Sequence, residues 1–362
     1  TAGNWLFVDG EKSLYINPAG LVSSDLTWEK ASTFNIGLDF TMLNQRLDFS
    51  FDWYQRTTSD MLVKVEYPEV LGTTAPPANK AELRTRGWEV SVKWNDRIGN
   101  DFSYDLGFIL SDSQAEITKY ENPSGTLSDY YVGQKIGEIW GYETEGFYQS
   151  DTDVQNHADQ SKLGANWAPG DIMYKDLDGN KKINNGSNTL DDHGDLKVIG
   201  NTTPRYQYGI TANMSYKNVY LNVFFQGIGK RDFWPSSQPF WPVATQYYNT
   251  QKWFVTDSWS EDNRDAYFAR PIARETKNQQ KQTKYLQDAS YCRLKNLTVG
   301  YDFPKSWLSF LHVAKAGVYF SAENLFEFTN VKGAYDPEAA GKNGTMVYPF
   351  QRTYSFGLNV TF

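Results

Sequence analysis

The sequence predicts an all-β protein, an antiparallel transmembrane β-barrel with long extracellular loops. Nine segments alternate apolar with small polar residues, so each would be a strand with one apolar and one polar face. Short and long connections alternate along the chain, as they do in outer-membrane barrels. The last segment, YSFGLNVTF, carries its apolar set to the final residue, Phe362. A lipid-facing strand that ends at the membrane rim accounts for such a terminal aromatic residue.

The composition agrees with a barrel and argues against several other classes. The 362 residues carry a net charge of -8, which argues against a nucleic-acid partner. No apolar run reaches the roughly 18 residues that indicate a transmembrane helix. The strands of a transmembrane barrel contain no such apolar run, because only every second residue is apolar. The single cysteine, Cys292, and the three histidines argue against a disulfide framework and a zinc site.

The strands are predicted from the alternation alone. In 33–40, for example, Phe34, Ile36 and Leu38 share one face while Asn35 and Gly37 share the other. The remaining predicted strands are 46–54, 84–94, 101–110, 205–216, 218–227, 292–301, 315–326 and 354–362. A soluble β-sandwich also alternates in this way, so it stays open as the other interpretation.

The connections predict which end of the barrel faces outward. Residues 43–46, 95–100, 216–218 and 303–315 are short or compact, whereas large loops are expected around 57–85, 113–203, 230–289 and 327–350. Short turns lie on the periplasmic side of outer-membrane barrels and long loops outside. We therefore expect 1–31 to be an extracellular segment leading into a barrel portion at 32–362, with a periplasmic C-terminus. An extra pair of strands within 113–203, one of them in GYETEGFYQS, would leave this parity unchanged.

Seven phrases in order then resemble one family. They are LTWEKASTFNIGLDF, ANKAELRTRGWEVSVKW, GEIWGYETEGFYQS, GDIMYKDLDGNKKI, VIGNTTPRYQYGITANMSYKN, YCRLKNLTVGYDFP and ENLFEFTNVKGAYDPE. From about Leu26 to Phe362 the chain resembles the C-terminal part of the SusC/RagA family, the TonB-dependent outer-membrane transporters of Bacteroidetes.

The resemblance implies a fold, a function and partners. The family forms a barrel of about 22 strands around a plug, of which this chain would supply about 9–11. Its members import oligosaccharides, or peptides in the RagA branch, through the outer membrane of Gram-negative bacteria. A SusD-like surface lipoprotein closes over the barrel, and TonB supplies energy through the plug. Because this sequence shows no plug and no TonB box, we expect an N-terminal, plug-bearing half, either as the rest of one polypeptide or as a second fragment.

An aromatic-rich connection is the first candidate site. Flat aromatic faces stack on the C–H faces of sugar rings. Prolines at 235, 239 and 242 would stiffen the backbone that carries these aromatic residues. Self-packing of the loop, or contact with the lipoprotein, is the alternative role. The predicted substrate-binding residues are Trp234, Phe240, Trp241, Tyr247, Tyr248 and Trp253.

The stretch KDLDGNKKINNGSNTLDD is the second candidate, a calcium site in the 176–195 loop. It has the 1-3-5 oxygen spacing of a calcium loop, but Lys181 and Ser187 replace the usual Gly and Glu. The acids at 191, 192 and 195 follow an insertion. A turn held by its own Asx side chains is the alternative. The predicted ligands are Asp176, Asp178, Asn180, the carbonyl of Lys182, Asp191 and Asp192.

Other acidic residues are interpreted as structural. Glu323 and Asp336 are expected to anchor a loop at the barrel rim rather than to form a carboxylate pair. Lys93 or Arg46 is expected to pair with acids that line the lumen, which are Asp39, Asp48, Asp52, Glu89 and Asp105.

No nucleophile or metalloprotease motif occurs, so no enzyme activity is predicted. The alternatives to oligosaccharide import are peptide import and a soluble β-rich glycan-binding or adhesion domain.

Overall fold

Nine long strands form one antiparallel sheet in the part of the chain that the structure describes. The computed structural model describes residues 2–8, 11–16, 26–64, 76–237, 240–244, 250–309, 313–333, 335–340 and 350–362. The sheet order is β17-β16-β15-β12-β11-β6-β5-β4-β3. All nine predicted strands are confirmed, as β3 Lys30–Met42, β4 Leu47–Val63, β5 Ala78–Ile98, β6 Phe102–Lys119, β11 Arg205–Tyr216, β12 Val219–Lys230, β15 Tyr291–Asp302, β16 Lys315–Thr329 and β17 Thr353–Thr361.

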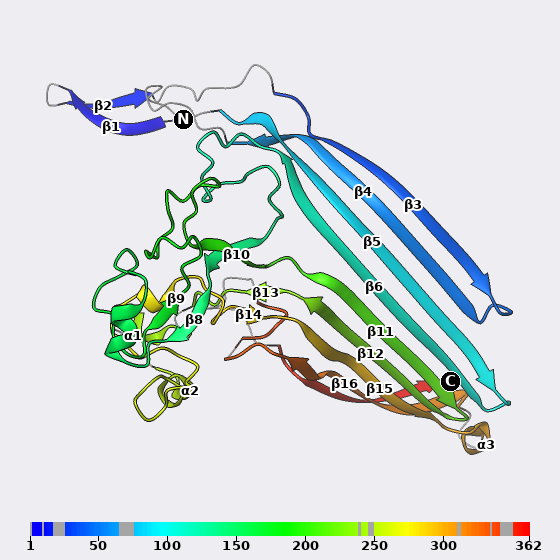
Figure 1. Ribbon diagram of the computed structural model, residues 1–362. Coiled ribbons are helices and arrows are strands. Elements are labelled where there is room, and N and C mark those ends of the chain that lie inside the picture. The colour runs from blue at the N-terminus through cyan, green and yellow to red at the C-terminus, as the bar shows by residue number, and fades with distance from the viewer. Residues whose placement is uncertain are drawn as a thin grey trace.

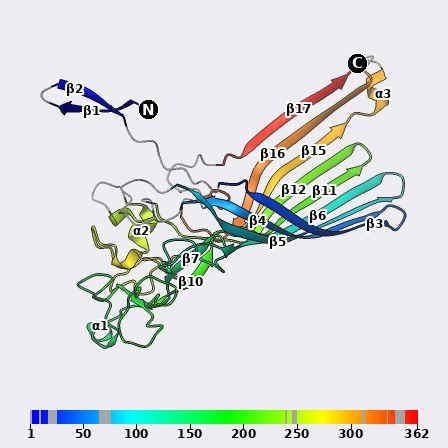
Figure 2. The same ribbon diagram turned by 90° about the horizontal axis from the view of Figure 1, so that it is seen from above.

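The sheet is strongly curved and open. Figures 1 and 2 show its strands wrapping around a hollow, with β3 at one edge and β17 at the other. Within the described residues neither edge strand pairs on its outer side. A curved antiparallel sheet with two free edges has the shape of part of a barrel wall, because barrel closure requires each edge to find a partner strand.

One face of the sheet is apolar, and no second sheet covers it among the residues that the structure describes. The register places apolar residues opposite one another, as in Ile36 with Trp53 and Leu38 with Phe51. Phe34, Phe356 and Phe362 are 60%, 84% and 92% exposed. In a soluble sandwich a second sheet would cover such a face, yet the sheet leaves these side chains bare. The soluble alternative is therefore not supported, and lipid is the cover that this face fits.

Polar residues occupy the opposite, hollow face. Three cavities of the sheet are lined mainly by this polar face, on strands β3 to β6, β11 and β12. The alternation in each strand and the pairing of like residues across strands together produce this separation.

The long connections all leave one end of the sheet, and the short ones join strands at the other end (Figure 1). The expected loop at 57–85 is shorter, because β4 continues to Val63 and β5 begins at Ala78. Arg84 still pairs with Thr57 there, since backbone hydrogen bonding does not require the apolar alternation that marked the strands. Helix α3, Lys305–Leu308, lies in the connection between β15 and β16.

Two of the long connections fold together into a unit that we call the loop module, the described residues 120–204, 231–237, 240–244 and 250–290. Its elements are β7 Glu138–Tyr142, β8 Thr144–Phe147, α1 Asp151–Asn156, β9 Ile172–Tyr174, β10 Leu196–Asn201, β13 Asp232–Phe233, the 3-10 helices η2 Pro242–Ala244 and η3 Lys277–Gln279, α2 Lys252–Thr256 and β14 Gln287–Asp288. Strands β7 with β10, β8 with β9 and β13 with β14 form separate two-stranded sheets. The extra strands expected within 113–203 therefore exist, but they belong to the loop module and not to the barrel wall.

Two further features complete the fold. Strands β1 Ala2–Val8 and β2 Glu11–Ile16 form an antiparallel hairpin ahead of the large sheet. No helix among the described residues is long and apolar enough to cross a membrane.

Candidate functional site

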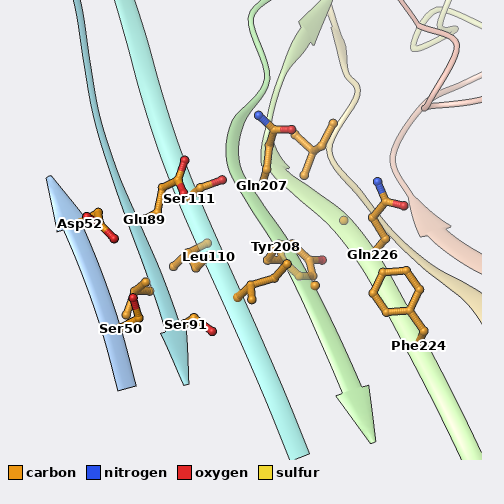
Figure 3. Close-up of a pocket in the computed structure, with 15 residues that line it drawn as sticks. Ser50, Asp52, Glu89, Ser91, Leu110, Ser111, Gln207, Tyr208, Phe224 and Gln226 are labelled. Atoms are coloured by element: carbon orange, nitrogen blue, oxygen red, sulfur yellow. The ribbon is translucent and has the colours of Figure 1, made fainter. Parts of the chain in front are cut away.

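The polar face carries a row of side chains at one level of the sheet. The register sets Asp52 opposite Glu89, Glu89 opposite Ser111, and Ser111 opposite Gln207. Figure 3 shows these four side chains across four strands, along the cavity that they help to line. The cavity measures about 510 Å³. A polar wall of this kind suits the passage of hydrated solutes through a barrel lumen.

Asp52, Glu89 and Asp105 line the cavities of this wall, as the sequence predicts. Lys93 pairs with Asp105 at 3.2 Å, which confirms one expected ion pair. Arg46 pairs with Asp96 at 3.3 Å instead of with one of the predicted lining acids, because both residues lie next to short turns. Asp52 accepts a hydrogen bond from the amide of Asn35 at 3.0 Å.

The aromatic connection folds inward and forms the core of the loop module. Phe240 and Trp241 are 1% and 8% exposed, and their rings contact Phe268 and Tyr285. The Trp241 indole donates a hydrogen bond to the Pro235 carbonyl at 2.7 Å. A sugar does not stack on a ring whose faces are covered, so this burial gives no support to the predicted substrate-binding role of Phe240 and Trp241, which stays a prediction. Self-packing, the alternative role, is what the structure shows for these two residues.

The other predicted aromatics divide into two groups. Trp234 and Trp253 are half-buried and pack against the rim of the same core. Tyr247 and Tyr248 lie outside the described residues. Of the described residues in the predicted set, only Trp234 and Trp253 are therefore partly exposed.

Trp234 also lines a cavity of about 540 Å³, which we call the Trp pocket. Its lining residues are Trp140, Gly141, Tyr142, Lys162, Leu163, Asn185, Leu196, Trp234, Gln279, Gln280 and Lys281. They come from β7, β10, η3 and four connections, and some of these are distant in sequence. No local pattern marks Trp140 or Gln279 as site residues, because only the tertiary fold brings them to the same cavity as Trp234.

A buried ionic cluster holds the loop module together. Asp171 is fully buried and accepts hydrogen bonds from Arg270 at 2.8 Å and from Asn278 at 2.9 Å, and it pairs with Lys277 at 3.0 Å. Burial would raise the pKa of Asp171, but these partners outweigh burial and lower it. The contacts join the two connections of the module across about 100 residues of sequence. The cluster is structural, since its groups satisfy one another.

The calcium-like stretch folds into a compact loop with three acids together. Oxygen atoms of Asp176, Asp178 and Asp195 lie within 4.8 Å of one another. Lys181, at the position usually held by Gly, adopts φ 62° and so takes the left-handed conformation that Gly would supply. Asp195 brings in an acid from beyond the insertion.

Several of the predicted calcium ligands lie outside the three-acid group or already form hydrogen bonds within the protein. Asp191 and Asp192 do not join the three-acid group, and Asp192 instead accepts hydrogen bonds from Ser187. The amide oxygen of Asn180 accepts from the Lys182 backbone at 2.7 Å, and the Lys182 carbonyl accepts from Asn184 at 3.1 Å. The carboxylates also accept backbone N–H groups, as in an Asx-rich turn.

Asp336 anchors a loop, as expected. Arg293, whose side chain is 1% exposed, pairs with Asp336 at 2.7 Å and with Glu338 at 2.6 Å. Glu323 instead faces Asn296 and Thr353 across the sheet, so the two acids do not form a pair. This network fastens the described segment 335–340 to β15.

The histidines take part in local packing. His157 contacts the Tyr148 hydroxyl at 3.0 Å and Glu145 at 3.5 Å. His193 lies against the ring of Trp140. His312 lies outside the described residues.

Comparison with known proteins agrees with this architecture. The family model described as "TonB dependent receptor-like, beta-barrel" matches residues 3–325. TonB-dependent receptor P3 of Formosa agariphila is 30% identical over 94% of this chain and 35% of its own length. TonB-dependent receptor SusC of Bacteroides thetaiotaomicron is 27% identical over 94% of this chain and 32% of its own length. The chain thus spans about a third of these relatives.

A solved structure shows the same fold. The RagAB peptide transporter aligns with all of this chain and 38% of its own chain, with a TM-score of 0.74 and 25% identity. The RagAB peptide importer in its "open-open" state aligns equally well, with a TM-score of 0.74.

Proposed function

The chain belongs to the TonB-dependent receptor-like β-barrel family, and we propose that it forms the C-terminal part of the barrel wall of an outer-membrane importer. This family comprises transporters rather than enzymes. The observation that carries the proposal is the curved nine-stranded sheet, with a bare apolar face outside and a polar face toward the hollow. Lipid fits the first face, and a solute pathway fits the second.

The rest of the transporter would lie in the remaining two thirds of the length of the relatives. That part would contribute the other barrel strands, which pair with the free edges of β3 and β17, and a plug that TonB engages. We place the long connections outside the cell and the short turns and Phe362 on the periplasmic side. A SusD-like lipoprotein would cover the long connections, as the likeness to SusC and RagAB supports.

Oligosaccharides are the substrates that we propose. The support is the Trp pocket, where Trp234 and Trp140 offer aromatic walls and three side-chain amides offer donors and acceptors for hydroxyl groups. Peptides are the second candidate, because the RagAB structures that share this fold are described as peptide transporters or importers. The burial of Phe240 and Trp241 removes part of the argument that favoured sugars from sequence alone.

Uptake measurements in cells test the proposal. We expect cells that lack the gene to lose energy-dependent uptake of an oligosaccharide, and an uncoupler to abolish uptake in the parent strain. Purification from membranes in detergent should recover a surface lipoprotein with the transporter. If the cells that lack the gene lose only peptide uptake, peptides rather than oligosaccharides are the substrates. Recovery of a detergent-free monomer without lipid or partner would contradict membrane insertion.

We also propose a structural calcium ion in the 176–195 loop, held by Asp176, Asp178 and Asp195. The left-handed Lys181 and the proximity of the three acids support this proposal. Hard oxygen ligands of this kind are the ones that Ca²⁺ prefers.

A further inference from the structure

The Trp pocket has a charge that is unusual for this protein. The chain has 43 acidic residues against 35 lysines and arginines. None of the acidic residues lines the pocket, whereas Lys162 and Lys281 do. The remaining lining residues are neutral, so the pocket has a positive lining in a protein of negative net charge.

The two pocket lysines differ from Lys175, Lys197 and Lys277 of the loop module, which form ion pairs. Lys175 pairs with Glu143 at 3.0 Å, and Lys277 pairs with Asp171. Among the described residues, no ion pair is formed by Lys162 or Lys281. Asp159, an acid near Lys162, is occupied by Ser161, whose backbone and hydroxyl donate to it at 2.9 and 3.0 Å. Asp159 still attracts Lys162 electrostatically, but no carboxylate forms an ion pair with either pocket lysine in the described part of the chain.

The wall that carries Lys281 is held in place by the backbone. The Tyr142 N–H donates to the Lys281 carbonyl at 2.8 Å, and the Thr283 N–H donates to the Tyr142 carbonyl at 3.1 Å. The segment also packs directly on Gly141, where a Cβ would stand 2.5 Å from the Lys281 oxygen. A pocket whose wall is fixed in this way loses little entropy when a ligand binds.

We propose that the Trp pocket binds an anionic segment of an oligosaccharide, with a carboxylate or sulfate group at Lys162 and Lys281. The apolar face of a sugar ring would lie against Trp234, and the amides of Asn185, Gln279 and Gln280 would bind its hydroxyl groups. This inference rests on the proposed import of oligosaccharides and narrows it to acidic ones. Charge-assisted hydrogen bonds from the lysines supply the selectivity over neutral sugars.

Calorimetric titration of the intact, detergent-solubilised transporter tests the inference. The probes are a hexamer of galacturonate, a sulfated hexasaccharide, neutral maltohexaose and a hexaglutamate peptide. We expect at least one acidic sugar to bind about tenfold more tightly than maltohexaose. The double variant Lys162→Gln/Lys281→Gln should lose this preference, and higher salt should weaken the acidic sugar selectively. Trp234→Ala should weaken acidic and neutral sugars alike.

Lys252→Gln is the matched control, because Lys252 is an exposed lysine of the same module that does not line the pocket. It should leave every affinity unchanged. Equal binding of acidic and neutral sugars, or an unaltered preference in the double variant, would overturn the inference while leaving oligosaccharide import intact. Binding of the peptide alone, or of none of the sugars, would overturn both.

Discussion

Tyr319 on β16 and Gly357 on β17 face each other directly in the sheet, and the tyrosine ring fills the place of the missing side chain. A Cβ at Gly357 would stand 2.2 Å from ring carbons of Tyr319. The same relationship joins Tyr54 with Gly87 and Tyr220 with Gly300. Such pairs cover a glycine in the sheet and fix the register of two strands.

Gly357→Ala should weaken the docking of the last strand. The new methyl group would collide with the Tyr319 ring, and overpacking of this kind costs about 1–3 kcal/mol. The temperature at which the purified barrel unfolds in an electrophoretic mobility assay should fall. Ser355→Ala, on the same face of β17, is the control and should have little effect. If Tyr319→Ala does not partly rescue Gly357→Ala, the collision is not the cause.

Asp171→Asn should destabilise the loop module and spare the sheet. The change leaves Lys277, whose side chain is 1% exposed, without its charge partner. Removing one partner of a buried ion pair costs about 3–5 kcal/mol. Hydrogen exchange should show faster opening at Ile172, whose backbone bonds Asn278. Asp262→Asn, at an exposed acid, is the control, and equal exchange in the two variants would contradict the prediction.

The same cluster predicts an acid limit for the loop module. The pKa of Asp171 is lowered from its ordinary value of 3.8. A carboxyl group whose folded pKa is depressed contributes stability above its unfolded pKa, and this contribution is lost as pH falls through the folded pKa. Protease resistance of the module should therefore be constant above about pH 5 and decline below about pH 4. The Asp171→Asn variant should lack this part of the decline.

Phe240 and Trp234 should respond differently to truncation. Phe240→Ala opens a cavity in the aromatic core and should cost about 3–5 kcal/mol of local stability. Trp234→Ala removes a pocket wall at the rim, so it should reduce oligosaccharide affinity with a smaller loss of stability. Hydrogen exchange and calorimetry on both variants separate the two effects. If Phe240→Ala lost oligosaccharide affinity without losing stability, Phe240 would be a substrate-binding residue and not a core residue.

Calcium should bind the 176–195 loop and protect it from proteolysis. Asp178→Asn removes one ligand charge from the three-acid group and should weaken Ca²⁺ binding by about tenfold. Asp191→Asn is the control, because Asp191 is exposed and lies outside the group. Calorimetric titration of Ca²⁺ measures both. Equal Ca²⁺ affinities in the two variants would contradict the calcium proposal and leave the loop as an Asx-rich turn.

The strands could be predicted because their signal is local. Alternation along β3 or β17 assigns each side chain to a face, whatever the rest of the chain does. The end of β4 could not be predicted, because Thr57 and Thr58 pair as strand residues without an apolar alternation to reveal them. The calcium-like spacing was visible in the sequence, but the choice of Asp195 over Asp191 and Asp192 depended on how the insertion folds.

The sequence by itself determined the apolar and polar faces, the nine strands and the alternation of short and long connections. Only the tertiary structure decided which aromatic residues are core and which line a pocket. Phe240 and Trp234 are both aromatic residues of one connection, and nothing local distinguishes them. Their difference arises from residues far along the chain. Phe268 and Tyr285 contact the Phe240 ring, whereas Trp140 and Lys281 line the same cavity as Trp234. Burial is a property of such distant contacts, so it appears only when the chain has folded.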